Sequence, residues 1–142
     1  PRPCTYWLPK SINNSSKLHE ENFFISDESA KKINSQLKDN KRIIAIGTTT
    51  LRALESSWNN ETNSVSPGKQ TTTIFIKEGF KFNVANALLT NFHLPQSSLL
   101  MLVCAFAGKE LIFSMYEFAI KNNLRFFSYG DAMIIERCPL NY

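Results

Sequence analysis

The sequence contains 142 residues, of which 43% are hydrophobic and 11 are phenylalanine, so it carries enough apolar material for one packed domain. Its 16 lysines and arginines outnumber its 12 aspartates and glutamates, and the net charge of +4 is compatible with a polyanionic partner such as RNA without requiring one. The longest apolar run, Leu99 to Ala107, is too short to span a bilayer, and the N-terminus lacks the pattern of a secretory leader.

The cysteines predict the compartment and argue against a zinc site. Cys4, Cys104 and Cys138 form no Cys-x-x-Cys pair, and only two histidines accompany them. Cys104 lies in an apolar run, where a buried free thiol is the simpler reading. An odd number of cysteines without a disulfide pattern favours a reducing, cytoplasmic setting.

The composition predicts that residues 1–17 form an irregular tail and that residues 18–142 form the folded domain. The tail contains Pro1, Pro3 and Pro9 and a polar run of asparagine and serine. Because the sequence opens on proline rather than methionine, we expect that a longer polypeptide was cut or trimmed.

A strand and a capped helix are predicted next. Glu21–Ile25 has the composition of a short strand. Ser26 follows as an N-cap, and Asp27 and Glu28 lie in the first turn, where negative charge favours a helix. Apolar residues then recur at helical spacing until Lys38–Asn40 ends the helix.

The middle of the sequence predicts a strand, a helix, a loop and a hairpin. Arg42–Ile46 is a compact apolar strand candidate, which leads through a Gly-Thr-Thr-Thr turn into a helix from about Leu51 to Ser57. Residues 59–70 are polar and contain a Pro-Gly pair, which is typical of an exposed loop. Thr71–Lys77 and Phe80–Val84 flank a turn and predict a hairpin.

The last third predicts two consecutive helices followed by two strands. Ser97 or Ser98 is placed to cap the first helix, and Gly108 to end it. The remaining predicted elements are a helix over Lys109–Lys121, a strand over Arg125–Ser128, a turn over Tyr129–Asp131 and a strand over Ala132–Ile135. Strands joined by both hairpins and helices indicate a mixed α/β fold.

The turn over Gly47–Thr50 is the first candidate site. A strand, a glycine turn and a helix start together present N–H groups and hydroxyls, which suit a carboxylate, a phosphate or a ribose hydroxyl. Thr48 and Thr49 can cap the helix and still donate outward, and Arg52 and Glu55 are spaced to pair with each other. Capping without any ligand explains the same threonines, and on this turn alone it is the better explanation.

The second candidate is the polar group Thr90, Asn91 and His93, which is crowded between apolar neighbours before a proline and a helix start. Serine caps at a helix start have an ordinary explanation, but the histidine does not. A lone histidine is more often a hydrogen-bonded structural residue than a catalyst, so both readings stay open.

Two further clusters are weaker. Ser128, Tyr129 and Asp131 gather two hydroxyls and a carboxylate at a turn, which an ordinary turn explains equally well. His19 stands beside two glutamates, an arrangement more typical of a surface than of a site.

Four segments, taken together, indicate more than these separate candidate sites do. In chain order they are IAIGTTTLRALES, TTIFIKEGFKF, LLTNFHLPQSSLLMLVCAFAG and FFSYGDAMII. They resemble the S-adenosylmethionine:tRNA ribosyltransferase-isomerase family of queuosine biosynthesis, over about His19 to Ile135. The strings TNFHLP and SYGDAM are the most specific parts of this resemblance.

The resemblance implies a fold, and this sequence departs from the family pattern at several positions. Family members have a longer chain with a β-barrel domain inserted into an α/β domain, and this sequence is similar only to the C-terminal part of the α/β domain. The N-terminal half and the inserted β-domain are absent from it, and residues 1–17 do not match the family. Gln96, Ser98 and Cys104 stand where lysine, threonine and serine are usual. The change at Gln96 removes a positive charge beside the expected site.

The resemblance also implies a reaction. S-adenosylmethionine donates its ribosyl group to 7-aminomethyl-7-deazaguanine at the wobble position of tRNA, adenine and methionine leave, and the ribose isomerises to give epoxyqueuosine. No metal is expected. Removal of a proton beside the sulfonium needs a base, and the leaving adenine needs a proton donor.

The site residues follow from the motifs. We expect His93 to perform acid/base chemistry, and Asp131 and Glu55 to bind hydroxyls or the amine. Arg52 is expected to pair with a carboxylate or phosphate. Hydrogen bonds to substrate are expected from Thr48, Thr49, Thr90, Asn91, Ser128 and Tyr129.

Three readings of the chain remain open. The first is a fragment of this cytoplasmic enzyme that has little turnover alone, with a separate N-terminal half as one candidate partner. The second is a non-catalytic remnant that acts as a binding or interaction module through an exposed apolar face. The third is a generic nucleotide-binding α/β protein, which would prefer ATP or adenosine to the sulfonium donor.

Overall fold

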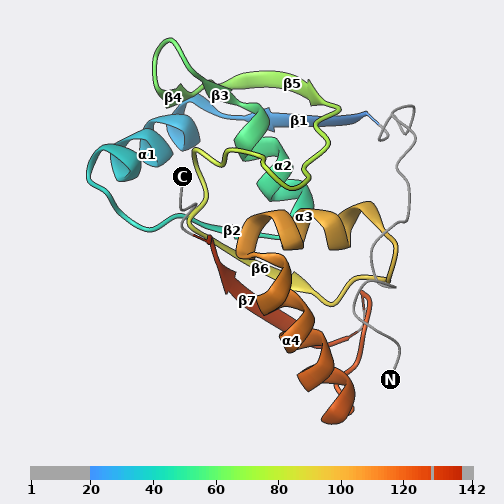
Figure 1. The fold of residues 1–142 in the computed structure, drawn as a ribbon. Helices are drawn as coiled ribbons and strands as arrows, with labels where there is room; N and C mark the ends of the chain where they lie inside the picture. Colours follow the sequence, from blue (N-terminus) through green and yellow to red (C-terminus); the bar gives the residue numbers. More distant parts are fainter. Residues whose placement is uncertain (1–19, 129, 139–142) are drawn as a thin grey trace.

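The protein combines helices with short strands in a computed structural model that describes residues 20–128 and 130–138 (Figure 1). The described elements are β1 (Glu21–Ile25), α1 (Asp27–Lys38), β2 (Ile44–Ile46), α2 (Thr48–Ser56), β3 (Trp58–Asn59), β4 (Ser64–Val65), β5 (Gly68–Thr72), β6 (Ala87–Asn91), α3 (Ser98–Ala107), α4 (Lys109–Lys121) and β7 (Ala132–Glu136). The predicted mixed α/β fold is confirmed. The predicted tail, residues 1–17, lies outside the described residues.

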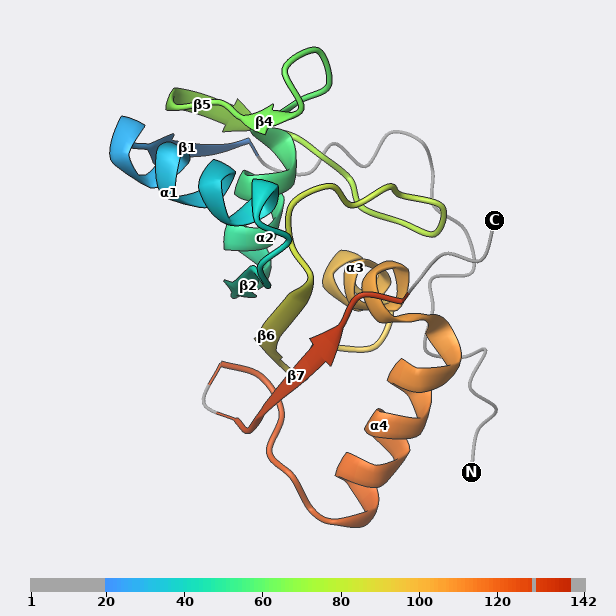
Figure 2. The same cartoon turned by 90° about the vertical axis from the view of Figure 1, so that its left-hand side faces the viewer.

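The sheet that organises the molecule has the strand order β2-β6-β7 (Figure 2). β2 and β6 are parallel, so their carboxyl ends lie at the same edge, and β7 is antiparallel to β6. The register aligns Ile46 with Leu89 and Leu89 with Ile134, which places the three in one row across one face. The opposite face carries Ala45 and Leu88, both fully buried in the core.

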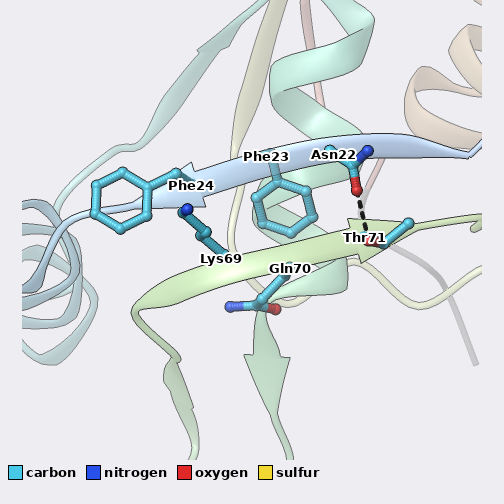
Figure 3. A pocket seen from close by; sticks show the side chains of 6 residues that line it. All are labelled: Asn22, Phe23, Phe24, Lys69, Gln70 and Thr71. Atoms are coloured by element: carbon cyan, nitrogen blue, oxygen red, sulfur yellow. Dashed lines mark hydrogen bonds between the residues drawn. The ribbon is translucent and has the colours of Figure 1, made fainter.

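A second, two-stranded sheet pairs β1 with β5. Its exposed side carries a shallow groove of about 580 Å³ that contains no predicted site residue. Figure 3 shows the side chains that line the groove, which are Asn22, Phe23, Phe24, Lys69, Gln70 and Thr71. This groove is therefore separate from the cavity described below.

The strand pairing overturns the predicted hairpin of Thr71–Lys77 with Phe80–Val84. β5 ends at Thr72 and pairs with β1, while residues 73–85 form no strand. Three apolar side chains of this stretch, Ile76, Phe82 and Val84, are buried in the core instead. The alternation of apolar residues predicts a hairpin here, but in the structure it reflects burial of side chains along an irregular segment.

The predicted exposed loop over residues 59–70 is also wrong in part, because β3, β4 and the start of β5 lie within it. Asn34 of α1 explains why this segment is ordered. Its side-chain amide donates to the Val65 carbonyl at 3.0 Å, and its side-chain carbonyl accepts from the Val65 amide at 2.8 Å. Val65 itself is 1% exposed, so the segment contributes to the core.

Two strand predictions change at other places. The strand predicted over Arg42–Ile46 is shorter, since β2 begins at Ile44. The strand predicted over Arg125–Ser128 is absent, because the Asp131 carboxylate accepts from the Arg125 amide at 2.8 Å and closes the segment into a loop. β6, which no local pattern predicted, is the central strand.

The predictions of α1, α3 and α4 from local signals are confirmed. Ser26 caps α1 by accepting from the Ser29 amide, and Ser97 caps α3 by accepting from the Leu100 amide, both at 3.1 Å. α3 ends at Gly108, and α4 has the predicted bounds. Among the described helices, none alone has the length and apolar composition of a membrane span; α3 and α4 meet that test only as a pair, and the chain bends by 117° between them.

Candidate active site at the carboxyl ends of β2 and β6

The cavity that gathers the predicted site residues has a volume of about 440 Å³ and lies where β2 and β6 end. Because these strands are parallel neighbours, the segments that follow them meet at one edge of the sheet, where α/β proteins bind their ligands. The lining residues are Ile46, Gly47, Thr48, Thr49, Thr50, Thr90, Asn91, Phe92, His93, Leu94, Ser97, Leu99, Phe127 and Ser128. Six of the predicted site residues are among them.

The first wall is the start of α2. The prediction that the threonines form a turn and cap a helix beginning near Leu51 is wrong, because α2 begins at Thr48 and its N-cap is Gly47. Gly47 has a φ of 89°, which favours glycine, and its amide donates to the Leu89 carbonyl at 2.8 Å. No side chain caps this helix. The positive end of α2 and the first-turn threonines therefore border the cavity together.

The second wall is the segment after β6, which carries His93. Its Nε2 lies 2.9 Å from the Thr90 hydroxyl, and Thr90 is buried. Burial lowers the pKa of His93 below the ordinary value of 6.5. The imidazole is therefore neutral at neutral pH, which is the form that accepts a proton.

Tyr116 holds this wall from behind, and sequence reasoning missed it. The His93 amide donates to the Tyr116 hydroxyl at 2.7 Å, and the hydroxyl donates to the His93 carbonyl at 3.2 Å. Tyr116 lies in the middle of α4, where the sequence predicts only a helix. Nothing local to Tyr116 connects it with a residue 23 positions earlier.

The third wall is the loop before β7, where Phe127 and Ser128 line the cavity. The Phe127 amide donates to the Phe92 carbonyl at 3.0 Å, which joins this loop to the histidine segment. A Cβ atom on Gly130 would overlap the carbonyl oxygens of Arg125 and Phe126, so only glycine fits there. Tyr129, predicted to bind substrate, lies outside the described residues.

Asp131 lies beside the cavity and does not line it. Its carboxylate accepts from the amide of Arg125 at 2.8 Å and from the guanidinium of Arg125 at 3.2 Å, and these bonds lower the pKa of Asp131 below its ordinary value. The Asp131 carbonyl accepts from the Asn91 side chain at 3.2 Å. The carboxylate therefore shapes the loop that carries Ser128, and the expected direct role of Asp131 has no support from its position.

Glu55 and Arg52 are buried and face away from the cavity lining. The Glu55 carboxylate accepts from the amides of Asn83, Val84 and Ala85 at 2.7, 3.1 and 3.0 Å, and burial raises the pKa of Glu55. Arg52 donates to the Glu21 carboxylate at 2.7 Å and to the Ile74 carbonyl. The expected pairing of Arg52 with Glu55 is wrong, and both side chains hold the chain around α2.

The chemistry available in the cavity is that of neutral donors and acceptors around one imidazole. Hydroxyl, amide and imidazole groups line it, together with the phenylalanines, and no lining residue carries a full charge when His93 is neutral. In residues 20–128 and 130–138, no group of three or more histidine, cysteine, aspartate or glutamate side chains is arranged to hold a metal ion. The arrangement suits a ligand that is bound through hydroxyl or carboxylate oxygens and that loses a proton.

Comparison with known proteins identifies the family. The model of the family described as queuosine biosynthesis protein matches residues 9–135, a range that begins inside the predicted tail. An S-adenosylmethionine:tRNA ribosyltransferase-isomerase from Rickettsia africae is 51% identical over 133 residues, which are 92% of this chain and 36% of the relative. The relative of that name from Treponema denticola is 50% identical, over 84% of this chain and 34% of the relative.

A solved structure supports the same assignment. The S-adenosylmethionine tRNA ribosyltransferase of Thermotoga maritima is 41% identical and superposes with a TM-score of 0.72, over 80% of this chain and 40% of that chain. The chain spans about a third of the length of the curated relatives it matches. The sequence match, the fold match and the gathering of the TNFHLP and IGTTT segments at one cavity agree, and the chain belongs to the queuosine biosynthesis protein family.

Proposed function

We propose that this chain provides part of the active site of an S-adenosylmethionine:tRNA ribosyltransferase-isomerase. The reaction transfers the ribosyl group of S-adenosylmethionine to 7-aminomethyl-7-deazaguanine at the wobble position of tRNA and isomerises it to give epoxyqueuosine. The observation that carries this proposal is the cavity itself, where six residues predicted from the family motifs line one volume. S-adenosylmethionine is the ribosyl donor in this proposal.

His93 is the proposed base. Its imidazole is neutral at neutral pH, lies among apolar and hydroxyl groups and borders the cavity, so it can accept the proton from the carbon next to the sulfonium. Thr90 orients the ring through Nε2. A neutral ring is also compatible with a cationic sulfonium beside it, since an imidazolium would repel the donor.

The start of α2 is the proposed binding site for the donor's oxygens. The N–H groups of its first turn and the hydroxyls of Thr48 and Thr49 suit a methionine carboxylate or ribose hydroxyls. Asn91 and Ser128 lie on the other walls and supply further hydrogen bonds. Adenosine or ATP binding alone, the third reading of the sequence, would not require the histidine.

Replacing Thr49 by valine tests this assignment in the chain itself. Isothermal titration of S-adenosylmethionine is expected to show binding about five- to tenfold weaker, because one hydrogen bond of about 1 kcal/mol is lost. Thr62→Val is the matched control, since Thr62 is exposed and lies outside the cavity. Equal affinity for Thr49→Val and the unaltered chain would contradict the assignment. Titration with the Thermotoga maritima relative supplies a reference affinity.

A second function, that of an interaction module, is favoured by the outer sheet face, which we define as Ile44, Ile46, Leu89 and Ile134. All-parallel sheets are covered on both faces almost without exception, and β2 and β6 form a parallel pair within this mixed sheet. Here Ile44, Ile46 and Ile134 are 46%, 69% and 57% exposed, and Ile46 and Ile134 flank Leu89 in one row across the sheet. Ile46 also lines the cavity, so a segment covering this face would extend one wall of the site.

We infer that polypeptide from the remainder of the family's length covers the outer sheet face, in the same chain or as a separate N-terminal half. Without it, positioning is incomplete and the 142-residue chain is expected to show little or no turnover with precursor-bearing tRNA.

The exposed isoleucines predict self-association of the purified chain. Sedimentation velocity is expected to show oligomers that dissociate when Ile134→Lys places a charge on this face. Phe118→Lys, which changes an equally exposed apolar residue on α4, is expected to leave the oligomers intact. A purely monomeric unaltered chain, or equal effects of both substitutions, would show that the outer sheet face does not drive association.

A further inference from the structure

The hydroxyl group of Tyr116 is hydrogen-bonded to the backbone of His93. The hydroxyl accepts from the His93 amide at 2.7 Å and donates to the His93 carbonyl at 3.2 Å. The side chain is 1% exposed and lies in the middle of α4, three residues beyond the buried Phe113. A phenylalanine would fill the ring's space in the core equally well, so packing alone does not explain the oxygen.

The ring of Tyr116 is fixed by its neighbours. Phe92 and Phe126 stack against it edge to face, with ring centroids 5.3 and 5.7 Å away, and these two phenylalanines lie 5.1 Å from each other. Phe92 precedes His93 in the chain, and Phe126 precedes Phe127 of the third cavity wall. The aromatic cluster therefore holds the Tyr116 hydroxyl at a defined position relative to the His93 segment and the loop before β7.

His93 lies in the described segment between β6 and α3, where no helix or strand hydrogen bonds hold its peptide. The Tyr116 hydroxyl supplies that support. Within the described part of the chain, the imidazole makes one hydrogen bond, between Nε2 and the Thr90 hydroxyl, and that bond requires the peptide of His93 to stay in place. A ring that must exchange a proton in a defined direction requires its own orientation to be held by surrounding groups. The Tyr116 hydroxyl fixes both polar groups of that peptide.

Among the described residues, the side chains that line the cavity together with His93 do not titrate near neutral pH. The groups that face it are threonines from α2 and β6, the Asn91 amide, Ser97 at the start of α3, and Phe127 and Ser128 from the loop. Burial raises the pKa of Tyr116 to about 12, so its hydroxyl remains protonated and keeps both hydrogen bonds through the neutral range. The ionisation of the imidazole therefore reports its own position in the cavity.

We propose that Tyr116 is a positioning residue for His93: its hydroxyl holds the His93 peptide so that the imidazole stays buried against Thr90 inside the cavity. The proposal deepens the function proposed above and rests on it for the catalytic meaning of His93. The geometric statement can be tested without any ligand, so a failure of S-adenosylmethionine binding and a failure of this proposal are separate results.

The test is Tyr116→Phe in the 142-residue chain, with the His93 ring followed by NMR across a pH series. The sequence contains only two histidines, so His19→Gln assigns the signals. Loss of the hydroxyl is expected to release the segment toward solvent and to raise the titration midpoint of His93 toward its ordinary 6.5. Ile112→Val, a buried change on the same helix that removes no hydrogen bond, is expected to leave the midpoint unchanged.

An unchanged His93 midpoint and unchanged ring shifts in folded Tyr116→Phe would overturn the proposal, as would an equal shift in Ile112→Val. If Tyr116→Phe does not fold, hydrogen exchange in the unaltered chain decides the question. The His93 amide, which donates to a buried hydroxyl, is expected to exchange as slowly as the central amides of α4. Fast exchange of that amide would show that Tyr116 does not hold the peptide.

Discussion

Replacing His93 by alanine is expected to lower turnover by about 10²- to 10⁴-fold, the usual contribution of a positioned acid or base. The assay requires a complete active site, so the variant is made in a chimaera in which this chain replaces the matching segment of the Thermotoga maritima relative. Turnover of S-adenosylmethionine with precursor-bearing tRNA is measured by release of adenine. His93 is the only described cavity residue that titrates near neutral pH, so the loss should fall on the rate of the chemical step.

The pH dependence separates a base from a merely structural histidine. Burial lowers the pKa of His93, so the ring becomes protonated only below 6.5 and turnover should fall as the pH decreases through that lowered value. In His93→Ala this acidic limb should disappear. Thr62→Val, remote from the cavity, should keep both the rate and the limb. Unchanged turnover of the His93→Ala chimaera would remove the acid/base role.

Replacing Glu55 by alanine is expected to lower the free energy of unfolding by about 3 kcal/mol or more, the largest stability effect among the predicted site residues. The Glu55 carboxylate accepts three backbone amides, and two of their residues, Val84 and Ala85, are buried at 1% and 0% exposure. Removal leaves these amides without a partner in the core. Urea or thermal unfolding monitored by circular dichroism measures the loss.

The control for this substitution is Glu61→Ala, because Glu61 is exposed and its replacement is expected to change stability by no more than about 0.5 kcal/mol. The raised pKa of Glu55 also predicts how the free energy of unfolding changes with pH. Because burial raises its pKa above 4.5, the folded chain holds a proton at pH values where the unfolded chain has lost it. The contribution of Glu55 to the free energy of unfolding therefore falls as the pH rises from 4.5 through the raised pKa. In Glu55→Ala, this pH dependence of the free energy of unfolding is expected to be absent. A loss below 1 kcal/mol would show that the carboxylate does not organise residues 83–85.

The contrast between Glu55 and His93 shows how motif residues divide between two tasks. Both belong to segments that carry the family resemblance, and the resemblance implies that both contact substrate. The carboxylate of Glu55 is occupied by the backbone after residue 82, whereas His93 borders an open cavity. A strong family motif therefore marks positions under constraint without distinguishing the fold from the reaction. The partners of each side chain make that distinction.

The sequence by itself determined the elements whose hydrogen bonds close within a few residues. Ser26, Ser97 and Gly108 mark helix ends because a cap needs only neighbours three or four positions away, and Gly108 also precedes the start of α4. The family followed as well, since four motifs in order are a property of the chain itself.

Only the tertiary structure decided which strands pair and which groups share a cavity. β5 pairs with β1 across more than 40 residues rather than with its neighbour, and β6 is central although nothing local predicts it. Tyr116 meets His93 only because α4 packs on the segment after β6. Such partners are chosen by burial and by the satisfaction of distant backbone groups, and these depend on the whole packed core rather than on the residues beside them.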